Sequence, residues 1–149
     1  MILVTGGTGL VGSHLLFELV QRGEKVRAIK SKTSNLADVK KVFSFYSANP
    51  EELFLKIEWI EGNVMDVNSL LEAIKGVEKV YHCAAIISFS PNEAERMMKV
   101  NIEGTSNVVN VCIEQKIKKL CYVSSVASLG VEGATDVITE ETHWKISSL

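Results

Sequence analysis

The sequence has little of what marks a secreted, disulfide-bonded or membrane-spanning chain. Its three cysteines, Cys83, Cys112 and Cys121, are odd in number and show no C-x-x-C spacing, so we expect reduced, partly buried thiols and no disulfide framework. No apolar run approaches the roughly 18 residues needed to cross a bilayer. The first residues have the pattern of a strand followed by a glycine turn, which is not that of a signal peptide. These absences favour a cytoplasmic protein without a membrane partner.

An excess of charge of one sign is missing as well. The sequence has sixteen Lys and Arg and eighteen Asp and Glu, which gives a net charge of −2. It therefore lacks the excess of positive charge that is typical of proteins that bind nucleic acid. The histidines His14, His82 and His143 are scattered, so we interpret them as structural or surface residues and expect no metal site. G-x-S-x-G is absent, which argues against a serine hydrolase.

What is present is a regular alternation of short apolar segments and helical patterns. With 149 residues, of which 46% are apolar, the chain suits one domain with a sizeable core. Strands are expected at residues 1–4, 26–29, 57–61, 79–82 and 120–123, and helices at 12–22, 36–45, 51–55, 67–75 and 93–115. This alternation predicts an α/β fold with a doubly wound parallel sheet of the Rossmann type, in the strand order 3-2-1-4-5. Residues 131–149 are expected as a polar loop.

The first expected helix should turn a set of apolar side chains toward the core. They are Val11, Leu15, Leu16, Leu19 and Val20.

The turn after the first strand carries the clearest chemical signal. Gly6, Gly9 and Gly12 form G-x-x-G-x-x-G, and Gly7, Gly9 and Gly12 also satisfy G-x-G-x-x-G. One glycine permits the tight turn, one leaves bare backbone for a pyrophosphate, and Gly12 lets the helix pack closely on the strand. The N–H groups and dipole of the helix N-terminus attract the anion. The alternative, an ordinary strand–helix turn, is disfavoured because the pattern lies directly between a strand and a helix.

The end of the second strand bears on which dinucleotide binds. An NAD-preferring fold usually carries Asp or Glu there, whereas this sequence has Lys30, with Lys32 two positions on and Arg27 nearby. An ammonium group would pair with a 2′-phosphate, so we predict NADP over NAD. The alternative is that these lysines are solvated loop charges.

Polar and small residues follow the third and fourth strands. Asn63 is able to bond to the adenine amino group and Val64 to pack on its ring, although an Asx turn explains Asn63 equally well. Ala84 and Ala85 would leave room for a dinucleotide at the mouth of the fourth strand, and simple close packing is the alternative.

Two further residues are unusual in their setting. Asn101 lies within an expected helix, where Asn is a poor choice, and could bind backbone groups of the loop after the fourth strand; a solvent-facing Asn is the alternative. Ser125 follows the fifth strand, and its hydroxyl would point into the same cleft, where it could bond to a substrate carbonyl or alcohol.

Taken together, the chain resembles the extended branch of the short-chain dehydrogenase/reductase superfamily. Within that branch it is similar to dihydroflavonol reductases, hydroxysteroid dehydrogenases and nucleotide-sugar epimerases. The motifs are TGGTGLVG at residues 5–12, GNV at 62–64, HCAA at 82–85, NIEGT at 101–105 and YVSSVASLG at 122–130.

The resemblance implies a role for each matching residue. Dinucleotide binding falls to Gly6, Thr8, Gly9, Leu10, Val11, Gly12, Lys30, Lys32, Asn63, Val64, Cys83, Ala84, Ala85 and Asn101. Ser125 matches the catalytic Ser/Thr that orients the substrate oxygen while hydride passes to or from the nicotinamide. Asn63 departs from the pattern, because the family more often has Asp there.

The family's general acid/base, a Tyr followed four residues later by Lys, has no match. None of Tyr46, Tyr81 and Tyr122 has Lys at that spacing. We therefore expect the N-terminal, cofactor-binding part of a longer protein, without its final strands and substrate domain and with little or no activity. A non-catalytic NADP-sensing protein is the alternative. A small-molecule substrate follows from the resemblance, and a homodimer is one option that it implies.

Overall fold

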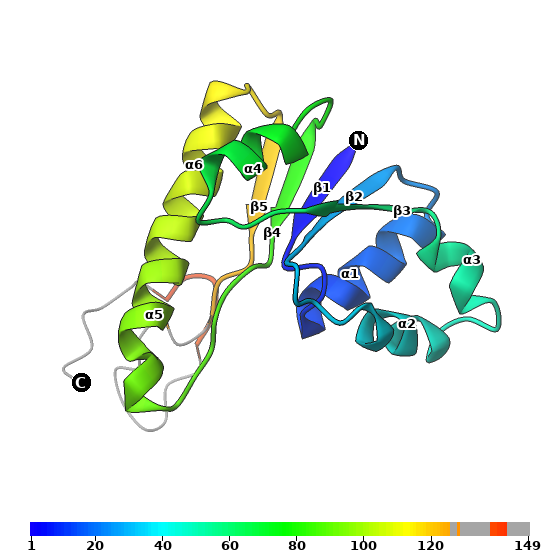
Figure 1. Ribbon diagram of the computed structural model, residues 1–149, viewed down its shortest axis with the longest axis horizontal. Helices are drawn as coiled ribbons and strands as arrows, with labels where there is room; N and C mark the ends of the chain where they lie inside the picture. The colour runs from blue at the N-terminus through cyan, green and yellow to red at the C-terminus, as the bar shows by residue number, and fades with distance from the viewer. Residues whose placement is uncertain (126–127, 129–137, 143–149) are drawn as a thin grey trace.

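The computed structural model describes residues 1–125, 128 and 138–142, which form one parallel sheet with helices on both faces (Figure 1). The strand order is β3-β2-β1-β4-β5, as the sequence predicts. The strands are β1 (Ile2–Thr5), β2 (Val26–Lys30), β3 (Ile57–Glu61), β4 (Lys79–His82) and β5 (Lys119–Tyr122). The expected tail, residues 131–149, lies outside the described part except for 138–142.

The helices divide between the two faces of the sheet. One face carries α1 (Leu10–Gln21), α2 (Leu36–Ser44) and α3 (Pro50–Phe54), and the other carries α4 (Val67–Ala73), α5 (Ala94–Lys99) and α6 (Thr105–Glu114) (Figure 1). This split follows from right-handed crossovers, since the chain moves outward from β1 to β3 and then returns to continue through β4 and β5.

All four residues of β1 are buried because helices cover both faces of this central strand. Ile2 and Val4 pack into an apolar core with Leu16 of α1, whereas Leu3 points to a second core with Val80 of β4. Alternate residues of one strand thus hold the two layers together.

The buried face of α1 differs from the expected one. Leu16, Leu19 and Val20 are buried and Leu15 is partly buried, but Val11 is 51% exposed, so its placement in the core was wrong. The helix turns Ser13, Leu16 and Phe17 inward, and Val11 falls on the opposite stripe.

The long helix expected at 93–115 is interrupted. A 3₁₀ turn, Pro91–Glu93, precedes α5, and a π-helical segment, Val100–Gly104, joins α5 to α6. Gly104 lies so close to Val64 that an added Cβ would be 2.7 Å from Val64 Cγ2. The π-helical segment therefore sits where this helix touches the loop after β3, and such segments often occur at functional sites.

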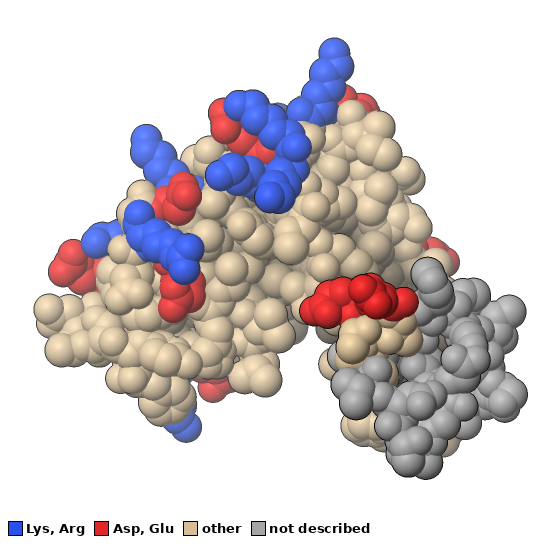
Figure 2. All heavy atoms as spheres, turned by 180° about the vertical axis from the view of Figure 1, so that it is seen from behind, with Lys and Arg blue, Asp and Glu red and all other residues tan. Residues whose placement is uncertain are grey.

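The surface carries charges of both signs. On the face drawn in Figure 2, Lys and Arg side chains lie beside Asp and Glu in several places, with uncharged areas between them. Exposed ion pairs such as Lys40–Glu51, at 2.9 Å, contribute at most about 1 kcal/mol each. In the part of the chain that the structure describes, no helix combines the length and apolar character needed to cross a membrane.

Candidate functional site

A cavity of about 550 Å³ opens at the carboxyl ends of the strands, where the loops after β1, β2, β3 and β4 meet. It lies beside the adjacent strands β1 and β4, which are the point at which the strand order reverses and where open α/β sheets bind ligands. It is lined by Thr5, Gly6, Thr8, Gly9, Ile29, Ser31, Thr33, Ser34, Asn63, Val64, Met65, Cys83, Ala84, Ala85, Ile86, Arg96 and Val100.

Two glycines shape the loop between β1 and α1. Gly6 has a φ of +69°, and a Cβ on it would lie 2.6 Å from the backbone N of Ala84. A Cβ on Gly12 would lie 2.1 Å from the carbonyl oxygen of Gly6. Gly12 therefore allows α1 to pack closely against the glycine loop that directly follows β1.

Gly9 has a different role, because its open side faces the cavity. It caps α1 with φ −83°, and an added Cβ would meet only the Gly6 carbonyl oxygen, at 3.4 Å. The N–H groups of the following residues, Leu10, Val11 and Gly12, belong to the first turn, which has no intrahelical acceptors. Bare backbone, unpaired donors and the positive helix end fit a pyrophosphate.

The side chains of Leu10 and Val11 lie outside this cavity. They line an apolar hollow on the outer side of α1 together with His14, Leu15 and Glu18. A role of Leu10 and Val11 in cofactor binding accordingly rests on their backbone N–H groups.

At the end of β2, the residues on the cavity wall are not the lysines on which the NADP prediction rests. Neither Lys30 nor Lys32 is among the residues that line the cavity, and Lys32 Nζ lies 3.7 Å from Glu61 Oε1 in an exposed ion pair. Hydroxyl groups stand there instead: Ser31 Oγ lies 2.9 Å from Ser34 Oγ and 3.3 Å from Thr33 Oγ1. The Ser/Thr-rich composition of residues 31–34 was the signal for them in the sequence.

Arg27 serves the fold and not the cavity. Its guanidinium, in a side chain only 12% exposed, pairs with Glu58 and donates to the carbonyl oxygens of Ala73 and Lys75 at 2.7 and 2.8 Å. It thereby satisfies carbonyls at the C-terminal end of α4. Arg27 is therefore already engaged within the fold and is not available for a 2′-phosphate.

The loop after β3 places Asn63 and Val64 on the cavity wall. Asn63 Oδ1 accepts the backbone N–H of Met65 at 2.9 Å, so the Asx turn that the sequence allowed is present. This bond fixes the side chain at the cavity edge. The second lone pair of Oδ1 remains suited to an amino donor.

Asn101 contacts the loop after β4, as one of its two interpretations had it, and the solvent-facing alternative was wrong. Its Oδ1 accepts the N–H of Ile86 at 2.8 Å and its Nδ2 donates to the carbonyl oxygen of Ile86 at 2.9 Å. This pair of bonds clamps the loop that carries Cys83, Ala84 and Ala85 along the cavity.

Cys83, which lines the cavity, is not activated. Burial, with a smaller contribution from Cys121, raises the pKa of the Cys83 thiol to about 11. Cys83 is therefore protonated at neutral pH and unsuited to nucleophilic chemistry. All three cysteines are free, as the sequence suggested, but Cys121 is exposed and not partly buried as expected.

His82 forms a buried polar contact that the sequence did not reveal. Its Nδ1 lies 2.6 Å from Thr5 Oγ1, and its Nε2 lies 3.0 Å from Thr105 Oγ1. Burial lowers the pKa of His82, so the ring is neutral at neutral pH. His82 is thus a structural histidine, in agreement with its interpretation, and His143 lies outside the described residues.

Ser125 is exposed just beyond the end of β5 and is not among the cavity-lining residues. Ser128 Oγ donates to its carbonyl oxygen at 2.6 Å. Because β5 pairs with β4 in parallel, Ser125 lies at the same edge of the sheet as the cavity. Val126, Ala127, Leu129 and Gly130 of the same motif lie outside the described residues.

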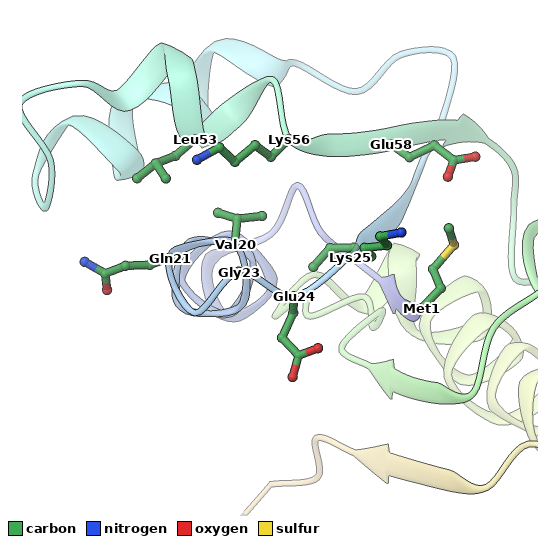
Figure 3. A pocket seen from close by; sticks show the side chains of 10 residues that line it. Met1, Val20, Gln21, Gly23, Glu24, Lys25, Leu53, Lys56 and Glu58 are labelled. Carbon is green, nitrogen blue, oxygen red and sulfur yellow. The ribbon is translucent and has the colours of Figure 1, made fainter.

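A second hollow, of about 600 Å³, lies at the opposite edge of the sheet (Figure 3). It is lined by Val20 of α1, by Gly23 and Lys25 in the turn between α1 and β2, and by Leu53 of α3. It is at the amino ends of the strands, which is the wrong edge for a dinucleotide in this architecture. Within the described ranges, no three His, Cys, Asp or Glu side chains gather where they could hold a metal ion.

Comparisons with known proteins place this geometry in context. The model of the NAD dependent epimerase/dehydratase family matches residues 2–148. Sterol demethylase protein B from Methylococcus capsulatus is 30% identical over 147 residues, which are 97% of this chain and 39% of that protein. Dihydroflavonol 4-reductase from Callistephus chinensis is 32% identical over 145 residues, or 96% and 38% of the two chains.

A solved structure is similar in fold as well as in sequence. It is a short-chain dehydrogenase/reductase superfamily protein from Agrobacterium tumefaciens with bound NAD, which is 26% identical. The TM-score is 0.74, and the match covers 99% of this chain and 40% of the other. The chain thus spans about two fifths of the length of these relatives.

Proposed function

Because the chain belongs to the NAD dependent epimerase/dehydratase family, we propose that it is the dinucleotide-binding part of an NADP-dependent oxidoreductase. The observation that carries this proposal is the open side of Gly9. Gly9 lies at the N-terminus of α1 and lines the cavity beside β1 and β4. Because it has no side chain, the backbone there is open to a ligand, which is what binding of a pyrophosphate requires.

The remaining walls support binding of the rest of the dinucleotide. Asn63 and Val64 would hold the adenine, and Cys83, Ala84 and Ala85 leave a narrow wall of small side chains beside Gly6. Thr8, on the same loop as Gly9, also lines the cavity and would add a hydroxyl near the phosphates.

We propose NADP over NAD because cations and hydroxyl groups occupy the end of β2 and the residues after it, where a carboxylate would select NAD. Ser31, Thr33 and Ser34 line the cavity, and Lys30 and Lys32 alternate with them in the chain. A 2′-phosphate would receive hydroxyl donors from the first group and charge from the second. Lys32 would exchange its exposed partner, Glu61, for the phosphate at little cost, since exposed ion pairs are weak.

Titration calorimetry with NADPH and NADH tests the cofactor and its preference. We expect NADPH to bind about tenfold more tightly, equivalent to about 1.4 kcal/mol, through charge-assisted bonds to the 2′-phosphate. Lys32→Ala should bring the ratio of the two affinities close to one. Lys25→Ala, which removes a lysine at the opposite edge of the sheet, is the matched control and should leave it unchanged. Equal affinities in the wild type would refute the preference, and no binding of either would refute the function.

The chemistry proposed for the whole protein is hydride transfer at an alcohol or carbonyl carbon of a small molecule. The nicotinamide would accept or supply the hydride. The Ser125 hydroxyl would hold the substrate oxygen by a hydrogen bond, as the resemblance implies, at the edge of the sheet where the cavity opens. Reduction, epimerisation and dehydration remain alternatives for the net reaction.

A second candidate is a protein that binds NADP without turning over a substrate. Among residues 1–149, none of the tyrosines has a lysine four positions on, and Tyr46 packs on Phe17 while Tyr122 stacks on His82, so none of them matches the family's general acid/base. A positioned general acid/base contributes about 10²–10⁴-fold to the rate of an enzyme that has one. Partner binding that changes on addition of NADPH, with no substrate present, would distinguish the sensor from the enzyme.

A homodimer remains part of the proposal. Met98 and Ile102 are exposed on one side of the long helix, and they line a shallow apolar hollow with Glu95, Lys99 and Glu103. A second copy of the chain would cover these apolar side chains.

A further inference from the structure

His82 lies at the end of β4, immediately before the segment that forms one wall of the cavity. Its side chain is only 1% exposed, and the Thr5 hydroxyl opposite it on β1 is fully buried. Its ring stacks on Tyr122 of β5 with centroids 5.4 Å apart. The imidazole is therefore enclosed by β1, β5 and the Thr105 end of α6.

The contacts around Thr5 set a direction for the hydrogen bonds. Ala84 N–H donates to Thr5 Oγ1 at 3.3 Å, and Thr5 Oγ1 lies 2.6 Å from His82 Nδ1. A hydroxyl has one hydrogen to donate, and among the described residues Nδ1 is the acceptor in reach of this one. His82 Nδ1 then accepts, so that Nε2 carries the hydrogen of the neutral ring and donates to Thr105 Oγ1 at 3.0 Å. The reverse direction would leave the buried Thr5 hydroxyl hydrogen without an acceptor.

This chain of bonds joins two segments that both line the cavity, the glycine loop after β1 and the segment after β4. Thr5 directly precedes Gly6, and Ala84 follows His82 by two residues. The walls are already at contact, because a Cβ on Gly6 would lie 2.6 Å from Ala84 N. The backbone also pairs here, with Cys83 N–H donating to the Thr5 carbonyl oxygen at 3.1 Å. The side-chain bonds hold the N–H of Ala84 turned back toward β1 and thus away from the cavity.

We propose that His82 is a positioning residue for the nucleotide cavity, which it serves as the centre of a one-way hydrogen-bond chain from Ala84 N–H through Thr5 and His82 to Thr105. The chain fixes the spacing between the glycine loop and the Cys83–Ala84–Ala85 wall, and it requires the Nε2–H tautomer. This inference rests on the proposed function for its effect on cofactor binding, but its structural part is testable without any cofactor.

The first experiment uses the chain without cofactor. Nitrogen-15 NMR of the imidazole should show Nδ1 without a proton and Nε2 with one. The Ala84 amide should exchange with solvent about tenfold faster in Thr5→Val, which keeps the branched shape but removes the hydroxyl, and in His82→Phe. Thr5→Ser, which keeps the hydroxyl, should stay within about twofold of the wild type. Ser106→Ala is the control in α6, because that hydroxyl donates to the Ile102 carbonyl oxygen in the preceding π-helical segment.

The second experiment measures NADPH affinity for Thr5→Val, Thr105→Val and the double variant. Each single change should weaken binding about tenfold, and the double change should weaken it by clearly less than the product, because either one already breaks the same chain. Thr5→Ser, which keeps the hydroxyl, should bind NADPH with about the affinity of the wild type. If the two changes acted independently through packing alone, their separate fold-losses of NADPH affinity would multiply in the double variant.

Three results would overturn the inference. They are a proton on Nδ1, an unchanged Ala84 exchange rate in folded Thr5→Val, and unchanged NADPH affinity in the valine variants. A wild-type chain that binds neither dinucleotide would refute the proposed function and with it the positioning role. The tautomer and exchange data would still decide whether the hydrogen-bond chain exists.

Discussion

Gly12→Ala is expected to lower the free energy of unfolding by about 3 kcal/mol, at the upper end of the usual cost of overpacking. The added Cβ would lie 2.1 Å from the Gly6 carbonyl oxygen and 2.9 Å from the Gly7 Cα, both of which are backbone atoms in a loop held between β1 and α1. The loop would have to move, and with it the first turn of α1. Urea denaturation of the variant and the wild type measures the difference.

Gly76→Ala is the matched control for this expectation. Gly76 has a φ of +73°, but its added Cβ would meet nothing within 4 Å. Only the cost of the left-handed conformation applies there, about 1 kcal/mol. If Gly12→Ala proved as mild as Gly76→Ala, the close packing of α1 on the glycine loop would be contradicted.

Gly9→Ala is expected to leave the fold intact and to weaken NADPH binding about 100-fold, equivalent to about 2.7 kcal/mol. Its φ of −83° suits alanine, and its Cβ would touch only the Gly6 carbonyl oxygen, at 3.4 Å. The methyl group would occupy the space above the helix N-terminus where the pyrophosphate is proposed to lie. It would hold the phosphate oxygens away from their N–H donors.

Two measurements on Gly9→Ala separate binding from folding. The urea midpoint should fall only slightly, because alanine is a weaker N-cap than glycine, while calorimetry with NADPH should show the loss of affinity. An affinity equal to that of the wild type would place the dinucleotide elsewhere. A large loss of stability would show that Gly9 serves the fold and not the ligand.

The strand order and the glycine loop were predictable because local chemistry determines them. Short apolar strands alternating with helical patterns require a parallel sheet, and a strand, glycines and a helix in direct succession predict the phosphate loop. A structural role for Asn101 was also predictable, because Asn is unfavourable inside a helix and a compensating side-chain contact is therefore expected. Its two hydrogen bonds to the backbone of Ile86 are that contact.

What the sequence did not determine depends on residues distant in the chain. Arg27 contacts carbonyls at 73 and 75, and His82 contacts threonines at 5 and 105, so that neither partner is visible in the local pattern. The side of α1 that Val11 occupies follows from where the helix begins and how it rotates on the sheet, which a list of apolar positions does not fix. The sequence showed the charge of Lys30 and Lys32 but not where their side chains lie, and the structure places the neighbouring hydroxyl residues Ser31, Thr33 and Ser34 on the cavity wall.

The most direct measurement is an NMR titration of the nitrogen-15-labelled chain with NADPH, following each backbone amide. The largest shift changes are expected at Gly9, Leu10 and Gly12, where the first turn of α1 would donate to the pyrophosphate, with smaller ones at Val64 and Ala84. Shift changes centred on Val20, Gly23 and Leu53 at the opposite edge of the sheet, or no changes at saturating NADPH and NADH, would contradict the proposal that the glycine loop between β1 and α1 binds the pyrophosphate.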